Sequence, residues 1–226
     1  MSSGCEKRDS SLEASASASR PPRSVALINA VGCVGVGDDA HDSIAFLLGD
    51  FEEAYCAYAH EMAQMFGVFD DVTTPRFMHV VLPVVDAFAA YTECDSVVIG
   101  YTLEAGEDAT ESIANTVRLL SPTDVSRGMC VYTIAVDYSY DAENTFDSLD
   151  ALRTSCSEAG LLFSGGVLIG GGALLLRMEN MPRMGAARRR VSEATDELIE
   201  AVREGRDAGI IKVKPPMPRF LYNRLL

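Results

Sequence analysis

A glycine-rich stretch near the start of the chain is the first candidate for binding chemistry. Residues 31–37, VGCVGVG, lie between an apolar run at 24–30 and a segment with helical spacing. Such a loop binds phosphate well, because free N–H groups and the helix dipole attract anions. However, Asp38, Asp39 and Asp42 follow at once; they would repel a phosphate, and they can cap the helix themselves. The pattern favours capping, and its G-x-x-G-x-G spacing is not the dinucleotide fingerprint.

A second glycine-rich stretch and a run of arginines lie near the other end of the chain. Five glycines fall within residues 165–172, around an apolar run. They indicate either a close approach of the backbone to a ligand, or close packing of a helix on a strand or a β-bulge, and the sequence leaves these alternatives open. Arg177, Arg183 and Arg188 belong to a basic segment that extends to Arg190. This segment would lie beside a ligand bound at the end of the last strand. However, the pattern favours the start of a helix whose basic face is solvated.

Other residue types that carry chemistry form no recognisable motif. His41, His60 and His79 are isolated, and His60-Glu61 does not continue to the zinc motif HExxH. The G-x-S-x-G nucleophile motif is absent from the sequence. The six cysteines are scattered without a C-x-x-C pair, which is typical of small buried side chains. We therefore predict no catalytic side chain and no metal ligand.

The charge of the chain is divided unevenly. Residues 24–176 carry four basic and 23 acidic side chains, whereas residues 177–226 carry 11 basic and seven acidic ones. An acidic body of this kind repels nucleic acid and anionic membranes, so neither is expected as a partner. No apolar run is long enough to span a membrane and no signal peptide is recognisable, so we expect a cytoplasmic protein.

Strand and helix patterns alternate about five times after a polar segment at 1–23, which we predict to be a disordered tail. Continuous apolar runs joined by amphipathic helices indicate an α/β domain over 24–226, with a doubly wound parallel sheet covered on both faces. The last residues, 210–226, look extended and broken by prolines. Ligands of such sheets bind at the carboxyl ends of the strands. This rule selects the loops at 30–39, 101–108, 137–143 and 170–185.

Several segments resemble the NAD(P)H-dependent FMN reductases of the flavodoxin-like superfamily. VALINA resembles the opening strand of that family, and DSVVIGYTLEAG is similar to the segment whose loop covers the flavin ring. CSEAGLLFSGGVLIGGG resembles the fourth helix and fifth strand, and PPMPRFLYNRLL a tail found in one branch. The resemblance implies a five-stranded flavodoxin-like sheet, FMN as cofactor and NAD(P)H as substrate.

The resemblance also implies where FMN would lie. Its phosphate would be near the end of the first strand, its ring near the loop at 101–106 and the residues after the fourth strand, and a basic side chain would follow the fifth strand. The residues concerned are Asn29, Ala30, Val31, Gly32, Tyr101, Thr102, Leu103, Glu104, Ala105, Gly106, Asp137, Tyr138 and Arg177.

Two functions follow from these observations. The first is an FMN-dependent oxidoreductase that passes electrons from NAD(P)H to a small acceptor, in which the flavin carries the chemistry. The phosphate loop departs from the family, because it offers aspartates in place of serine or threonine. The alternative is therefore a flavin-free scaffold with a binding or regulatory role. Apolar residues near the C-terminus should pack on the domain or on a second subunit, which leaves a homodimer open.

Overall fold

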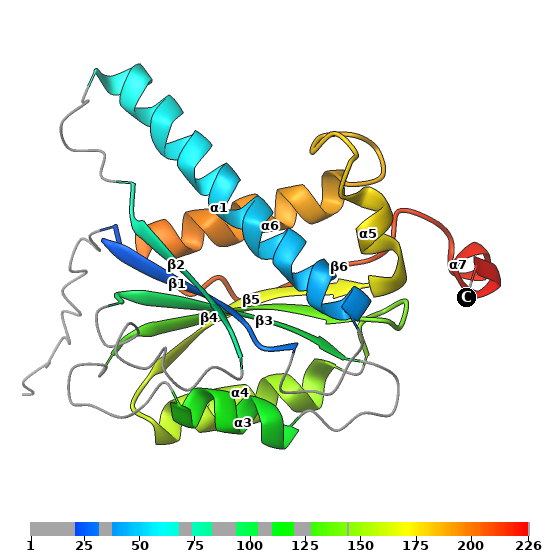
Figure 1. Ribbon diagram of the computed structural model, residues 1–226, viewed down its shortest axis with the longest axis horizontal. Coiled ribbons are helices and arrows are strands. Elements are labelled where there is room, and N and C mark those ends of the chain that lie inside the picture. Colours follow the sequence, from blue (N-terminus) through cyan, green and yellow to red (C-terminus); the bar gives the residue numbers. More distant parts are fainter. Residues whose placement is uncertain are drawn as a thin grey trace, which may run out of the picture.

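The protein is an α/β domain built on a six-stranded parallel sheet with the order β2-β1-β3-β4-β5-β6 (Figure 1). The computed structural model describes residues 21–31, 38–67, 74–82, 94–103, 110–119, 128–143 and 145–225. The predicted parallel sheet is confirmed, but the expected number of five strands is wrong. The additional strand comes from the segment predicted to be an extended tail.

The central strands are buried on both faces. The strands are β1 (Ser24–Asn29), β2 (Arg76–Val81), β3 (Ser96–Leu103), β4 (Cys130–Asp137), β5 (Leu162–Gly170) and β6 (Ile210–Val213). Every residue of β1 and β3 is buried, as the continuous apolar runs predicted, whereas the edge strand β2 is largely exposed. β1 begins directly after residues 21–23. The carbonyl of Arg23 accepts a hydrogen bond from Arg76 N.

Helices cover the two faces of the sheet in pairs (Figure 1). The helical segments are α1 (Asp38–Phe66), α3 (Thr110–Leu119), α4 (Thr145–Glu158), a 3₁₀ turn at Gly172–Leu174, α5 (Leu175–Met178), α6 (Arg189–Glu204) and α7 (Arg219–Leu225). α1 and α6 pack on one face through residues such as Ile44, Phe51 and Leu198, and α3 and α4 pack on the other through Ile113 and Leu152. These residues recur at three- and four-residue spacing, which gives each helix one apolar side.

The crossover into β6 differs from the others in hand. The chain moves from β1 to β2 in one direction with α1 on one face, and from β3 through β5 in the other direction with α3 and α4 on the opposite face. These connections therefore share one hand. β6 continues the second direction, but α6 lies on the α1 face, so this crossover has the other hand. The handedness rule, which about 98% of such connections obey, disfavours a sixth strand at this place.

The end of the chain turns back onto the sheet instead of running freely. After β6, residues 214–218 pass over the ends of β4 and β5, and α7 follows as a short helix projecting from the body (Figure 1). Tyr222 of α7 is buried and packs with Leu174 and Met178. The predicted helix at 83–94, except for Cys94, and the tail at 1–20 lie outside the described residues. In the part that is described, no helix has the length and apolar character needed to cross a membrane.

Candidate ligand site at the carboxyl edge of the sheet

The direction of winding reverses between β1 and β3. β1 lies between β2 and β3, and the helices that follow β1 and β3 pack on opposite faces of the sheet. In sheets of this kind, the loops after two such strands leave in opposite directions and open a crevice, which is the usual position of ligands. The residues predicted from the sequence can be placed relative to this crevice.

The end of β1 is fixed by backbone hydrogen bonds. Ala30 N donates to Gly100 O at 2.8 Å, and Asn29 O accepts from Leu82 N at 3.0 Å. The Asn29 side chain turns back on its own backbone, since Oδ1 accepts from Val31 N at 3.2 Å. Asn29, Ala30 and Val31 are thus at the predicted edge, but all three are buried. Gly32 and the rest of the glycine loop at 32–37 lie outside the described residues; α1 begins at Asp38, where a helix start was predicted.

Tyr101 lies in the core and not in the crevice. Its side chain is 0% exposed, and its hydroxyl is 3.3 Å from Ser148 Oγ of α4. Burial raises the pKa of Tyr101 to about 12, while the hydrogen bond with Ser148 opposes the shift. The buried ring cannot stack on a ligand. Tyr101 was predicted in the binding site, but it packs in the core under α4 instead. Leu103 belongs to the same core, and Glu104, Ala105 and Gly106 lie outside the described residues.

The Thr102 side chain points to the opposite face of the sheet from Tyr101, and its buried hydroxyl group is unusual. Side chains alternate along a strand, so Thr102 shares the face of Gly100, where a Cβ atom would approach Ile44 and Leu48 of α1. Thr102 is 0% exposed, and its Oγ1 has no hydrogen-bond partner among the described residues. Because β1 pairs with β3 only as far as Gly100, Thr102 lies beside the end of β1. A buried hydroxyl without a partner is unfavourable unless another group completes it.

The end of β4 carries Asp137 and Tyr138. Asp137 is 0% exposed, and its Oδ1 accepts a hydrogen bond from Ser139 N at 2.6 Å, which closes the turn. The ring of Tyr138 packs beside Gly172, where a Cβ atom would lie 3.3 Å from Tyr138 Cδ2. Both residues are at the predicted edge, but they support the turn after β4.

The C-terminal segment covers this part of the edge. The Tyr222 hydroxyl donates to Tyr138 O at 2.5 Å, and the Tyr140 hydroxyl donates to Met217 O at 2.7 Å. The ring centroids of Tyr140 and Tyr222 are 5.7 Å apart. Asp141 forms ion pairs with Lys214 at 2.7 Å and with Arg219 at 3.2 Å. These contacts could not be predicted from the sequence, except that the apolar residues near the C-terminus were expected to pack on some surface.

Gly171 shows how closely the segment packs. Its φ is 77°, in the left-handed region that favours glycine, and a Cβ atom at this position would lie 2.3 Å from Pro215 Cγ. At Gly171 the close neighbour is therefore the C-terminal segment and not a helix. The β-bulge predicted for the glycines at 165–172 agrees with the register shift between β4 and β5 before Gly166.

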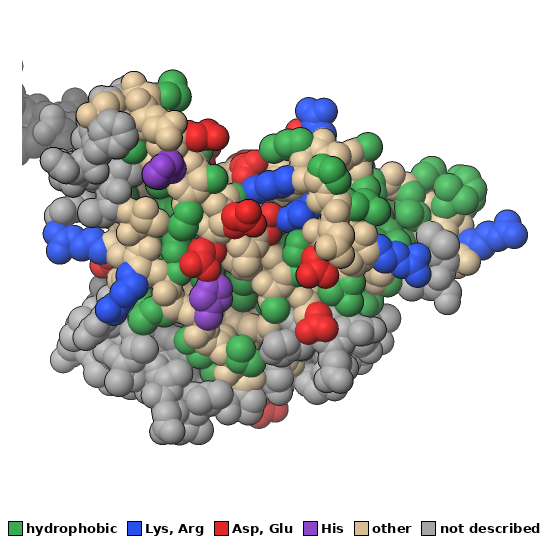
Figure 2. All heavy atoms as spheres, turned by 45° about the horizontal axis from the view of Figure 1, so that its top comes forward, with side chains coloured by type: hydrophobic (Ala, Val, Ile, Leu, Met, Phe, Trp, Pro, Cys, Tyr) green, Lys and Arg blue, Asp and Glu red, His purple; other side chains and the backbone are tan. Residues whose placement is uncertain are grey.

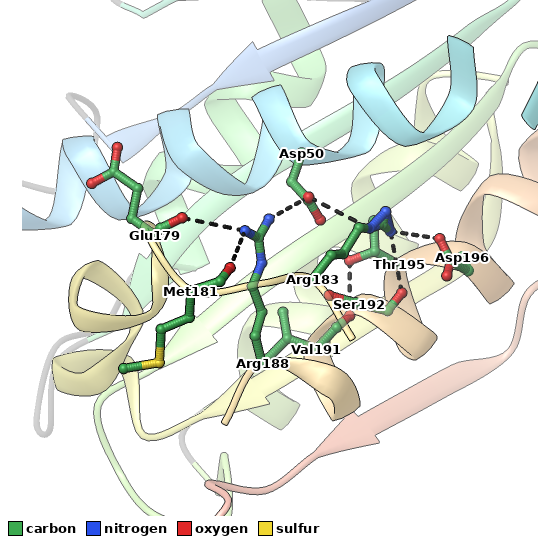
Figure 3. A network of polar contacts seen from close by, with 9 residues as sticks. All are labelled: Asp50, Glu179, Met181, Arg183, Arg188, Val191, Ser192, Thr195 and Asp196. Carbon is green, nitrogen blue, oxygen red and sulfur yellow. Dashed lines mark hydrogen bonds and ion pairs between the residues drawn. The ribbon is translucent and has the colours of Figure 1, made fainter. Parts of the chain in front are cut away.

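Two arginines of the basic segment after β5, Arg183 and Arg188, belong to an internal ion cluster (Figure 3). Arg188 is buried and pairs with Asp50 of α1; its Nη1 also donates to the carbonyls of Glu179 and Met181, both at 3.3 Å. Arg183 pairs with Asp196 at 2.5 Å and lies 3.6 Å from Asp50. Burial raises the pKa of Asp50, and the two guanidinium groups oppose this shift. The expected solvated basic face is therefore wrong for Arg183 and Arg188.

A signal for this cluster was present in the sequence. Asp50 is three residues after Leu47 and next to Phe51, on the apolar side of α1. A carboxylate in such a position needs a cation, because burying an unpaired charge is very costly. Arg177, the cation predicted for the site, is an exposed residue at the end of α5.

Comparisons of the chain with models of protein families, with curated proteins and with solved structures give no match. What the fold and the edge define is an α/β protein with a parallel sheet and a winding reversal between β1 and β3. Its function has to be inferred from this geometry.

Proposed function

We propose that the protein binds FMN in the crevice between β1 and β3 and acts as an NAD(P)H-dependent oxidoreductase. The observation that carries this proposal is the strand order. The run β2-β1-β3-β4-β5 has the order of flavodoxin-like sheets, in which FMN lies at the β1/β3 reversal. β6 is added at the far edge and leaves that reversal unchanged.

The described residues fit FMN on one side of the crevice. The Thr102 hydroxyl is buried beside the end of β1 and lacks a partner among the described residues, so it can donate to a polar group of a ligand. Arg177 is exposed, whereas Arg183 and Arg188 are occupied by Asp50. When bound, the flavin supplies hydride and electron transfer; the protein binds, orients and shields it. No acidic or basic side chain is needed for that step.

A specific observation favours the second function, a flavin-free scaffold with a binding or regulatory role. Tyr138 and the turn after β4, which were expected beside the flavin ring, are covered by Tyr222 and Met217. The C-terminal segment thus takes up part of the space at the β4 end where the planar ring was expected. A ligand at this edge is then restricted to the β1 and β3 side.

Replacing Thr102 by valine tests the site, because valine keeps the shape and removes the hydroxyl. The free protein should be equally stable or more stable, since the unpartnered group is gone. FMN binding, followed by quenching of flavin fluorescence, should weaken by about 0.5–1.5 kcal/mol, the range of one hydrogen bond.

Thr133→Val is the matched control, because Thr133 is equally buried but its Oγ1 already donates to Ile99 O at 2.9 Å. This variant should lose stability, and its FMN affinity should stay unchanged. Failure of the wild-type protein to bind FMN at high micromolar concentration would remove the oxidoreductase and leave the scaffold function.

A further inference from the structure

α7 presents an uncovered apolar face on a projecting element. Tyr222 fastens the helix to the body, whereas Phe220 and Leu221, on its outer side, are 71% and 43% exposed. Arg224 lies one turn further and is exposed as well. Figure 2 shows this projection, with its apolar and basic side chains at the right-hand edge of the molecule. We call residues 214–225 the C-terminal arm.

A groove of matching character lies between α1 and α6. It has a volume of about 440 Å³, with Ala54, Tyr58 and Ile199 as apolar lining. Three carboxylates and one guanidinium complete the lining: Asp196, Glu197, Glu200 and Arg203. Acidic side chains are visible on this face of the molecule in Figure 2. We call this hollow the α1–α6 groove.

Glu197 is the carboxylate of the groove that is open to a new partner. Asp196 already pairs with Arg183, and Glu200 with Arg206 at 3.1 Å. Glu197 has no ion-pair partner in the described ranges. Arg203 lies over the Tyr58 ring, with its guanidinium carbon 4.0 Å from the ring centre. The groove therefore suits an apolar segment that carries a cation.

The arm cannot reach the groove of its own chain. Tyr222 holds it at the carboxyl ends of β4 and β5. α6 starts at that edge and runs back across the sheet, so its residues 196–203 lie further toward the amino ends of the strands. The segment that fills the groove must come from another molecule.

We propose that the chain forms a homodimer in which the C-terminal arm of each copy binds the α1–α6 groove of the other copy. Phe220 and Leu221 cover the apolar lining, and Arg224 pairs with Glu197. One two-fold arrangement satisfies both surfaces of both copies, which is the usual form of a homodimer. The local charges also agree, because a cationic arm meets an acidic groove in a chain whose net charge of −14 would otherwise keep copies apart.

The test is the oligomeric state of the full chain, measured by sedimentation equilibrium at micromolar concentration. The wild-type protein should be a dimer. The arm variant Phe220→Ser/Leu221→Ser and the groove variant Glu197→Lys should each raise the dissociation constant about tenfold or more. Leu162→Ser is the control, because Leu162 is 55% exposed at the start of β5 and belongs to neither the arm nor the lining of the groove, so this variant should leave the dimer unchanged.

Mixing the two variants gives the decisive result. The mixed dimer regains one intact contact, between the arm of the groove variant and the groove of the arm variant, so it should form more tightly than either variant alone. A monomeric wild type, or a dimer that both variants leave unchanged, would overturn the proposal. In the first case, binding of the arm to phosphatidylserine vesicles or to another protein would account for its exposed face.

Discussion

The carboxyl ends of β1 and β3 and those of β4 and β5 belong to the same edge of one sheet, but they are completed differently. At β4 and β5, the turn after Asp137 is covered by the C-terminal arm, and the segment after β5 is fastened to α1 through Asp50. Beside β1 and β3, the Thr102 hydroxyl is buried without a partner among the described residues. The contacts at the β4 and β5 ends serve stability, and we propose the ends of β1 and β3 as the place where a ligand is accommodated.

The largest effect is expected from Asp50→Asn, which breaks the fastening of the β5 end. Asn keeps the shape of the side chain but leaves the buried Arg188 without its counter-charge. Such a loss destabilises a protein by about 3–5 kcal/mol, and urea unfolding measures it.

Asp150→Asn is the matched control. Asp150 also pairs with an arginine, Arg153 at 3.5 Å, but its side chain is 77% exposed. Its replacement should change the free energy of unfolding by less than about 1 kcal/mol. Equal effects of the two substitutions would show that the Asp50 cluster does not hold the β5 end.

A smaller effect is expected from Gly171→Ala, which tests the packing of the arm. The left-handed φ and the contact with Pro215 should together cost about 1–3 kcal/mol, and proteolysis should cut the released arm more readily. Gly67→Ala is the comparison, since Gly67 has a φ of 63° but nothing within 4 Å of its Cβ position. It should show the conformational cost alone, about 1–2 kcal/mol. If the arm stays protected in Gly171→Ala, the contact does not hold it.

The smallest effect concerns pH. A hydrogen bond from Lys214, helped by the charges of Lys214 and Arg219, lowers the pKa of Asp141 from its ordinary value of 3.8. The stabilising contribution of this contact is therefore complete above pH 3.8 and is lost as the pH falls through the lowered folded-state pKa. The wild type should lose stability in that acidic range more steeply than Asp141→Asn. Parallel pH profiles in urea unfolding would contradict the pairing.

Much of the fold was determined by the sequence itself. Local sequence was enough to predict seven elements, namely the strands β1, β3, β4 and β5 and the helices α1, α4 and α6. A continuous apolar run indicates a strand that is buried on both faces, and apolar residues at helical spacing indicate a helix that is buried on one side. The reversal between β1 and β3 then follows from general rules for parallel sheets. Asn29, Ala30, Val31, Asp137 and Tyr138 were accordingly predicted at the correct edge.

Only the tertiary structure decided what these residues do. Tyr101 and Thr102 are neighbours in one strand, yet the Tyr101 ring packs under α4 whereas the Thr102 side chain faces α1. Arg183 and Arg188 looked like free cations until Asp50, more than 130 positions earlier in the chain, was placed beside them. The tail became β6 and an arm because it pairs with β5 and because the Tyr222 hydroxyl donates to the Tyr138 carbonyl. Contacts between segments far apart in the sequence leave no local pattern, because the hydrophobic periodicity of each segment is the same whichever distant segment it contacts.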